Sequence, residues 1–540
     1  MKGRASIPPA ERIYLLLLAL AAMAPAGFLI AYILAAIPFP YGLDYNEGIV
    51  WQQMNDIVAG QGYASIGGFP AIVYHYPPVY HLLSAAVAAL GIDPLSAGRI
   101  VSLAAMAGST AIVMALTKPW LGGTGLDGTG VGRAGLGGDF SRGQRIVGMA
   151  GAAICLLGYR GVQDWAPLMR VDPLACFFAL AGLWLIIRAV ERPVLIYWAG
   201  AAFVLSVFTK QNSVLTAAAG LGVLLFHRPA LAMRGIATCV LLGSACLGIL
   251  IVRTDGRVLD HLILYNINRF DLARLVPNIV EGTSEADRLL LALSLAGLTW
   301  VLVKSRLWRE AGATPAALVG RQATVAFALL ATLSLIATAK YGSSSAYYMQ
   351  WEAGLALFGG VAMALFLRTG NRLWRDGRRG MGATCLALPL LVVLWTAVTT
   401  GPAHLRQVRN FRAQGDRLAP MLRAIHGPIL STEMALLLRT GHRVVWEPAI
   451  FRELSHAGRW DERSLVERIR KHQIAAVLSD GQQGYRWFDE QFSPAIAAAM
   501  DEALPRKIHV GLRVLHLPAK QGKGVSETPR PAEPRKSPAA

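Results

Sequence analysis

Charged side chains are scarce in this chain of 540 residues, where they make up 16% of the sequence while hydrophobic residues make up 54%. A soluble globular protein usually carries about 25% charged residues, so the deficit excludes a chain that is solvated by water throughout. Apolar runs recur from Tyr14 to Thr400. Many of them approach the ~20 residues that cross a hydrocarbon core. The composition therefore predicts a polytopic membrane protein.

Cysteine is also rare, and no C-x-x-C motif occurs. Every cysteine lies inside an apolar run, so we expect neither disulfides nor cysteine-ligated zinc. We interpret them as packing residues within the membrane region: Cys155, Cys176, Cys239, Cys246 and Cys385.

The net charge of +19 does not indicate a nucleic-acid partner, because the basic residues lie between apolar runs. Polytopic proteins collect Lys and Arg in their cytoplasmic loops. We therefore expect the lipid bilayer, and no nucleic acid, as the partner of this charge.

Lys and Arg are missing altogether from residues 38–78. The apolar run before them, 13–37, follows Lys2, Arg4 and Arg12. It is longer than the roughly 7–15 apolar residues of a signal peptide, so we predict a retained first span. The positive-inside rule then places the N-terminus inside and the first loop, 38–78, outside.

The remaining apolar runs predict eleven spans and an outside C-terminus. Residues 79–90 are too short to span and follow two prolines, which are favoured at helix starts, so we expect a helix at the outer interface there. The predicted spans are 13–37, 99–117, 146–158, 174–190, 194–209, 213–226, 235–252, 286–303, 322–339, 346–367 and 381–400.

The composition changes near Pro402, where charge rises and long apolar runs end. After the transmembrane domain, 1–401, we predict a small extracytoplasmic α/β domain over 402–518 and a disordered tail, 519–540. Within the small domain the patterns predict strands in 427–433, 442–449, 474–480 and 507–517 and an amphipathic helix in 461–472.

A glycine-rich segment, 118–145, contains the sequence GTGVGRAG. It lacks both the Lys-Ser/Thr pair that ends a phosphate-binding loop and a preceding strand. We expect a flexible inner loop.

Polar residues of five segments gather on the predicted outer face, where ionisable groups near the membrane tend to mark function. Simpler structural roles exist for each of them, namely helix capping, hydrogen bonding at the interface, an ion pair, or a lysine that extends to the headgroups. Their convergence on one face favours a site. The candidates are Asp44, Glu47, His75, Tyr76, His81, Arg170, Asp172, Lys210, Gln211 and Lys340.

These residue types suit the transfer of a group from a phosphate. A carboxylate can act as a general base, and Lys or Arg can hold a departing phosphate. Carboxylates can also bind a hard divalent cation. The sequence leaves a metal cofactor open, with Glu47, His75 and Asp172 as the ligands if one is present.

The order of the motifs resembles a known family. An early span is followed by DYNEG at 44–48, YHYPPVYHLL at 74–83, RIVSL at 99–103, RVDPL at 170–174 and KQ at 210–211. Over roughly residues 12–400 this pattern is similar to the GT-C class of membrane glycosyltransferases. It is most similar to the branch of bacterial protein-mannosyltransferase-like enzymes and lipopolysaccharide-core sugar transferases.

The resemblance implies a GT-C-like fold, with about 11 transmembrane helices and interfacial helices, in the bacterial cytoplasmic (inner) membrane. It implies an inverting transferase that takes a hexosyl or pentosyl group from a polyprenyl-phosphate carrier on the outer face. The acceptor would be a lipid, a glycan or a protein.

The resemblance also implies roles for the candidates. The base is a carboxylate of the first loop. The family's acids are adjacent, whereas here Asn46 precedes Glu47 and Asp44 is displaced, so both acids stay candidates. Asp172 matches the second acidic position of the family. The implied phosphate partners are Arg170, Lys210 and Lys340, and the implied substrate contacts are His75, Tyr76, His81 and Gln211.

Two alternatives belong to other classes. A transporter or flippase of a lipid-linked saccharide would often show inverted repeats and broken helices, and neither is evident in the sequence. A non-catalytic scaffold would leave the acids of the first loop without a role.

Overall fold

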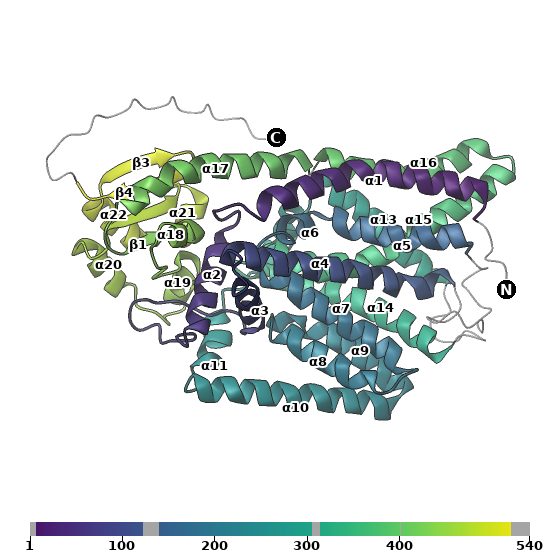
Figure 1. Ribbon diagram of the computed structural model, residues 1–540, viewed down its shortest axis with the longest axis horizontal. Coiled ribbons are helices and arrows are strands. Elements are labelled where there is room, and N and C mark those ends of the chain that lie inside the picture. The colour runs from purple at the N-terminus through teal and green to yellow at the C-terminus, as the bar shows by residue number, and fades with distance from the viewer. Residues whose placement is uncertain (1–6, 123–139, 305–313, 400, 520–540) are drawn as a thin grey trace.

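A bundle of long helices runs along the longest axis of the molecule, and a small domain of strands and short helices packs against one end of it (Figure 1). This computed structural model describes residues 7–122, 140–304, 314–399 and 401–519. The predicted phosphate-loop-like stretch and disordered tail lie almost entirely outside these residues.

All eleven predicted spans are helices. Eight are long and apolar enough to cross a membrane: α1 (Pro9–Ala36), α4 (Pro94–Thr117), α7 (Val171–Ala189), α10 (Pro229–Arg253), α13 (Glu285–Lys304), α14 (Pro315–Ser334), α15 (Met349–Arg375) and α16 (Arg379–Thr399). The other three are shorter: α5 (Arg142–Gly158), α8 (Leu195–Val207) and α9 (Val214–His227).

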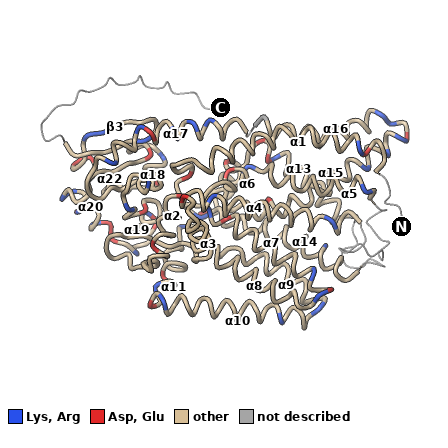
Figure 2. The backbone as a smooth tube through the Cα atoms, in the orientation of Figure 1, with Lys and Arg blue, Asp and Glu red and all other residues tan. Residues whose placement is uncertain are grey.

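The share of each helix that is buried inside the protein differs between the centre of the bundle and its edge. In α15, 78% of the most apolar stretch is buried inside the protein, whereas in α10 the share is 6%. A helix that is apolar on all sides yet unburied by protein requires lipid around it. Accordingly, α10 lies at the rim of the bundle (Figure 1). Charged residues gather toward the ends of the bundle and in the small domain (Figure 2).

Short helices form the segments that meet the small domain. The first loop contains α2 (Tyr45–Val58) and leads to α3 (Val79–Ala88), which is the predicted short helix of residues 79–90. The other short elements include α6 (Arg160–Trp165), η2 (Gln211–Ser213), α11 (Arg257–Leu262), η3 (Leu264–Asn266), η4 (Leu272–Arg274), α12 (Leu275–Gly282), η5 (Leu335–Ala339) and η6 (Ser345–Tyr348).

The C-terminal domain follows α17 (Gly401–Arg423) and contains a four-stranded sheet in the order β1-β2-β4-β3. Strand β1 (Ile429–Ser431) pairs parallel with β2 (Ala476–Asp480). Strand β4 (Arg513–Leu517) pairs antiparallel with β2 on its other side and with β3 (Arg506–Val510) at the edge of the sheet. The helices of the domain are α18 (Met434–Arg439), α19 (Pro448–His456), α20 (Arg463–Arg470), α21 (Arg486–Gln491) and α22 (Pro494–Ala503). The predicted amphipathic helix is α20.

One predicted strand is wrong. Residues 442–447 are extended, but they stay outside the sheet and pair with the first loop through a single bridge between Trp446 and Ala71. The alternating apolar residues of this segment enter the core of the domain beside that loop, with Trp446 only 1% exposed. Period-two burial therefore occurs here without strand pairing.

The C-terminal domain sits directly on α2. A Cβ atom at Gly48 would lie 2.1 Å from the backbone nitrogen of Ala435 in α18, so only glycine permits this approach. Arg439 pairs with Asp93 at 2.5 Å, and Arg443 pairs with Asp56 at 2.8 Å. The domain thus covers the loops at its end of the bundle.

Candidate active site

A cavity of about 1140 Å³ lies where these loops meet the C-terminal domain. Small-molecule sites usually measure roughly 300–1,000 Å³, so this cavity has room for two reacting groups. Selected residues line it within the segments 42–53, 75–76, 160–170, 210–212, 262–282 and 337–348, and within 411, 433, 447–456, 480–491 and 512–513 on the C-terminal side.

Asp44 lines this cavity at the start of α2. Its Oδ2 accepts a hydrogen bond from the backbone nitrogen of Asn46 at 2.8 Å and so caps the helix. The same oxygen accepts from Nη1 of Arg170 at 3.1 Å. Burial raises the pKa of Asp44, and the Arg170 guanidinium opposes that rise. A carboxylate with a raised pKa is a stronger base than a free aspartate.

Asp172 holds two cations that line the cavity. Its carboxylate pairs with Nζ of Lys210 and, at 3.4 Å, with Nε of Arg170. Lys210 also lies over the ring of Tyr347 at 4.3 Å, and Arg170 lies over the ring of Trp165 at 4.7 Å. Both cations are fixed in place, and carboxylates largely balance their charges. Asp172 itself does not occur among the described lining residues.

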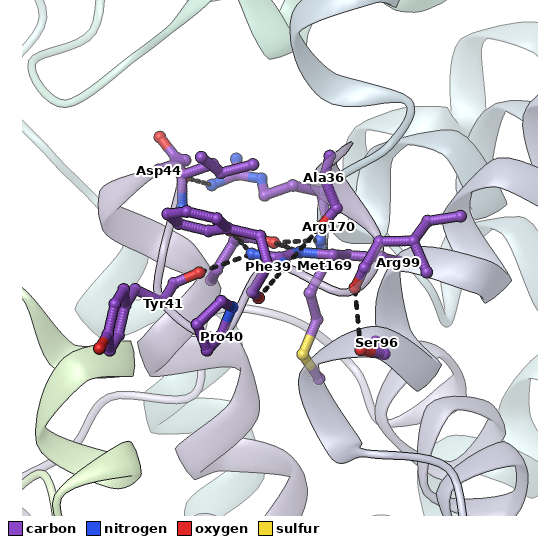
Figure 3. A network of polar contacts seen from close by, with 12 residues as sticks. Ala36, Phe39, Pro40, Tyr41, Asp44, Ser96, Arg99, Met169 and Arg170 are labelled. Atoms are coloured by element: carbon purple, nitrogen blue, oxygen red, sulfur yellow. Dashed lines mark hydrogen bonds and ion pairs between the residues drawn. The ribbon is translucent and has the colours of Figure 1, made fainter. Parts of the chain in front are cut away.

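Glu47 belongs to a separate, closed cluster around Arg99. Both side chains are 0% exposed, and Arg99 donates Nε and Nη2 to the two carboxylate oxygens of Glu47 at 2.8 Å each. Its remaining N–H groups donate to three backbone carbonyls (Figure 3) at 2.7, 2.6 and 2.8 Å, those of Ala36, Phe39 and Tyr41. All five guanidinium donors are therefore used.

The carboxylate of Glu47 is saturated as well. It accepts from the backbone nitrogens of Leu43 and Met169, each at 2.8 Å, in addition to the two bonds from Arg99. Glu47 does not occur among the described residues that line the cavity. Glu47, Arg99 and these five backbone groups, which we term the Arg99 cluster, join the first loop to α4 and to the segment before α7.

The predicted substrate contacts divide in the same way. His75, Tyr76 and Gln211 line the cavity, and the backbone oxygen of His75 accepts from Nε2 of Gln211 at 2.8 Å. Burial lowers the pKa of His75 to about 4, which keeps the imidazole neutral at pH 7. His81 is fully buried in the bundle, where Nε2 lies 3.2 Å from Oε1 of Gln53, and it is not one of the described lining residues.

A joint metal site is not assembled from the candidate ligands. The part of the chain that the structure describes contains no group of three or more His, Cys, Asp or Glu side chains able to hold a metal ion. Glu47 is engaged by Arg99, and Asp172 is engaged by Lys210 and Arg170. Of the three ligands predicted for the case that a metal is present, His75 is among the described residues that line the cavity, and Glu47 and Asp172 are not.

Two further cations, Arg269 and Arg274, join Lys340 at the cavity. They stack on the ring of Tyr341 at 4.1 and 3.8 Å from its centroid. Lys340 donates Nζ to the backbone oxygen of Asn266 at 2.9 Å. Arg269 pairs with Glu453 at 2.6 Å, whereas the described residues supply no carboxylate partner to Lys340 or Arg274. Arg274 is not among the candidates predicted from the sequence.

The C-terminal domain contributes a wall rich in carboxyl groups, which sequence reasoning missed. Four carboxyl side chains of this wall are less than 20% exposed, and three of them pair with an arginine, Glu433 and Asp480 with Arg513 and Glu453 with Arg269. The fourth, Glu447, precedes α19 and is 3% exposed. Burial raises its pKa to about 8, although the charge of Arg170 acts in the opposite direction.

Comparison with known proteins gives a match in structure. No protein-family model matches the sequence, and no curated protein matches it in sequence. The crystal structure of ArnT from Cupriavidus metallidurans bound to undecaprenyl phosphate aligns with 92% of this chain and 98% of its own, at 13% identity and a TM-score of 0.54. The apo structure of the same protein aligns with 92% and 97%, at 13% identity and a TM-score of 0.55.

This chain has a GT-C-like fold. The predicted fold class is thereby confirmed, including the mostly helical region and the small domain with its sheet. A structure of the apo oligosaccharyltransferase from Archaeoglobus fulgidus aligns with 84% of this chain and 69% of its own, at 11% identity and a TM-score of 0.49. In this GT-C-like fold the cavity lies between the helix bundle and the C-terminal domain.

Proposed function

We propose that this chain is an inverting glycosyltransferase of the bacterial cytoplasmic membrane. It moves a hexosyl or pentosyl group from a polyprenyl-phosphate donor to a lipid, glycan or protein acceptor on the outer face. One observation carries the proposal: a single large cavity combines a carboxylate of the first loop with cations that lack carboxylate partners among the described residues. The ArnT crystal structure with undecaprenyl phosphate supports this donor class, because its fold is similar over nearly the whole chain.

The geometry favours Asp44 over Glu47 as the general base. A base must reach the proton that it removes, and Asp44 lines the cavity whereas Glu47 is enclosed with four hydrogen bonds. Asp44 keeps one carboxylate oxygen, Oδ1, outside its bonds to Asn46 and Arg170, which both go to Oδ2. Asp172 is then a positioning residue that acts through Lys210 and Arg170.

The donor phosphate fits best beside Lys340 and Arg274. Arg170 and Lys210 are close to neutralised by Asp44 and Asp172. Cations without carboxylates keep their full attraction for a phosphate, and this attraction is strong in a partly buried site. Arg170 and Lys210 stabilise the charge that develops on the phosphate oxygen as the bond to the sugar breaks.

The reaction is a direct displacement at the anomeric carbon. An acceptor hydroxyl or amine gives its proton to Asp44, and its lone pair forms the new bond to the anomeric carbon. The bond from that carbon to the phosphate oxygen breaks, and the polyprenyl phosphate leaves with the electron pair. Attack from the side opposite the leaving group inverts the anomeric configuration.

The test compares membrane extracts from cells that lack the chain with extracts from cells in which it is restored. Mass spectrometry should find one lipid or glycan species that is heavier by a single sugar residue only when the wild-type chain is present. Asp44→Asn should abolish that product, and Asp255→Asn, at a surface acid that is 82% exposed, should retain it.

Full product formation by Asp44→Asn would reject Asp44 as the base. Movement of an unchanged lipid-linked saccharide across sealed vesicles, with no glycosylated product, would instead support the transporter.

A further inference from the structure

Glu447 differs from the other buried carboxyl groups on the C-terminal wall of the cavity, because no described residue forms an ion pair with it. Its Oε2 is enclosed, yet no described residue supplies it with a hydrogen-bond partner. Buried polar atoms are nearly always hydrogen-bonded, and an exception calls for a specific cause such as a missing ligand. The other buried carboxyl groups on the same wall, Glu433, Glu453 and Asp480, each form an ion pair with an arginine. Oδ1 of Asp480 also lacks a hydrogen bond among the described residues, but the Arg513 guanidinium neutralises its charge.

The position of Glu447 is fixed by the fold. Residues 442–447 run along the first loop, and the backbone nitrogen of Ala449 donates to the Tyr45 hydroxyl at 3.2 Å. This bond ties the first turn of α19 to the helix that Asp44 caps. Glu447 therefore faces the same cavity as the proposed base while belonging to the C-terminal domain. The cavity, at about 1140 Å³, has room for a second substrate beside the stacked cations at Tyr341.

Aromatic side chains accompany Glu447 on this wall. Tyr485 and Trp487 line the cavity from the C-terminal domain and are 36% and 54% exposed. Exposed aromatic rings beside hydrogen-bonding groups offer flat apolar faces with polar edges. A saccharide presents the complementary surface, with C–H faces and hydroxyl edges.

We infer that Glu447 positions the acceptor, and that the acceptor presents a saccharide hydroxyl to it. The inference rests on the proposed function and adds the acceptor's chemical class and a residue that holds it. A protonated Glu447 donates through its O–H and accepts through its carbonyl, which matches a hydroxyl group in both directions. Tyr485 and Trp487 form the platform on which the sugar ring lies.

The test uses the full chain in lipid nanodiscs and three variants. Glu447→Leu removes both hydrogen-bonding functions while filling similar space, Glu447→Gln keeps one donor and one acceptor, and Glu467→Gln is the control at an exposed acid of the same domain. The acceptor is the species from cells lacking the chain whose mass rises by one sugar when the chain is restored. The donor-side probe is undecaprenyl phosphate.

Glu447→Leu should raise the acceptor KM by about tenfold or more, the loss expected for one buried hydrogen bond. Its undecaprenyl-phosphate affinity should stay unchanged, and Glu447→Gln should recover the KM to within about threefold of wild type. Glu467→Gln should match wild type. A purely structural Glu447 would not give this split between acceptor and donor.

An acceptor KM for Glu447→Leu within about twofold of wild type overturns the inference. Should Glu447→Leu fail to fold, Glu447→Gln is measured for the same two quantities, the acceptor KM and the undecaprenyl-phosphate affinity. We expect its acceptor KM to change by about threefold or less. A loss of undecaprenyl-phosphate binding in this variant would contradict the inference. Absence of any glycosylated product with the wild-type chain is a different result, which rejects the proposed function itself.

Discussion

The Arg99 cluster contains Glu47, and the cavity is lined by Asp44, only three residues earlier in the chain. The two regions differ in whether their charged groups can still bind a substrate. In the Arg99 cluster every donor and acceptor is used within the protein. In the cavity, Lys340, Arg274 and Glu447 keep capacity that the described residues do not satisfy. Proximity in the chain therefore does not imply the same function, because the saturation of hydrogen bonds separates a structural charge from one available to a substrate.

The largest expected effect comes from breaking the Arg99 cluster. Glu47→Gln or Arg99→Met leaves the opposite charge buried without its partner, which typically costs about 3–5 kcal/mol. We expect loss of monodisperse protein in size-exclusion chromatography and a sharply lower melting temperature. Asp255→Asn is the matched control.

A Glu47→Gln variant that keeps the wild-type melting temperature and loses only its transfer activity would contradict this prediction. Glu47, and not Asp44, would then be the reactive acid.

The second effect concerns rate. Asp44→Asn removes the proposed base, and general-base catalysis typically contributes about 10²–10⁴-fold. The asparagine side chain can still cap α2, so the melting temperature should change little. Single-turnover transfer and thermal unfolding of the same preparation check both halves of this prediction. A parallel loss of rate and stability would place Asp44 with the structural acids.

Donor affinity gives a smaller effect. Lys340→Met and Arg274→Met should each weaken undecaprenyl-phosphate binding by roughly tenfold, the scale of one charge-assisted hydrogen bond. Neither substitution uncovers a carboxylate, so folding should be retained. Lys471→Met, at the exposed lysine that follows α20, is the control. Unchanged affinity in both variants would move the phosphate to Arg170 and Lys210.

The smallest effect is a gain in the stability of Glu447→Gln over wild type, which depends on pH. The pKa of Glu447 is raised from 4.5 to about 8, so the unfolded chain loses this proton at lower pH than the folded chain does. The wild-type fold is therefore penalised increasingly from about pH 4.5 to pH 8, by on the order of a few kcal/mol at most. Glu447→Gln should melt at the wild-type temperature near pH 4.5 and a few degrees higher above pH 8. A constant difference across this range would contradict the raised pKa.

Sequence periodicity predicted the helices well, because the lipid requirement leaves a strong apolar signal in each span. It also predicted that charges from separate segments meet at one end of the bundle. The pairing of those charges was not predictable. Glu47 and Arg99 are 52 residues apart, and nothing in their spacing shows that they enclose each other. Glu47 has four hydrogen bonds inside the protein, whereas Asp44 faces the cavity. Both depend on side-chain directions, which a sequence pattern does not contain.

Two failures have a common physical origin. The segment that contains Glu447 was predicted as a strand because its apolar residues alternate, yet it borders the first loop and ends at the cavity. Arg274 lies within an irregular stretch of short helices whose polar residues have no clear period. In both places the contact that matters joins distant parts of the chain. Local pattern has no access to such contacts.

The complete use of the Arg99 guanidinium has a consequence for recognising related sequences. A lysine at position 99 would bring three N–H groups to a place with five acceptor contacts and would strand backbone carbonyls in a dry interior. Substitution at either member of the 47–99 pair is then tolerable only when the other changes with it. Among distant relatives, we expect these two columns of an alignment to covary, and the pair should serve as a marker of descent even where the residues that line the cavity have diverged.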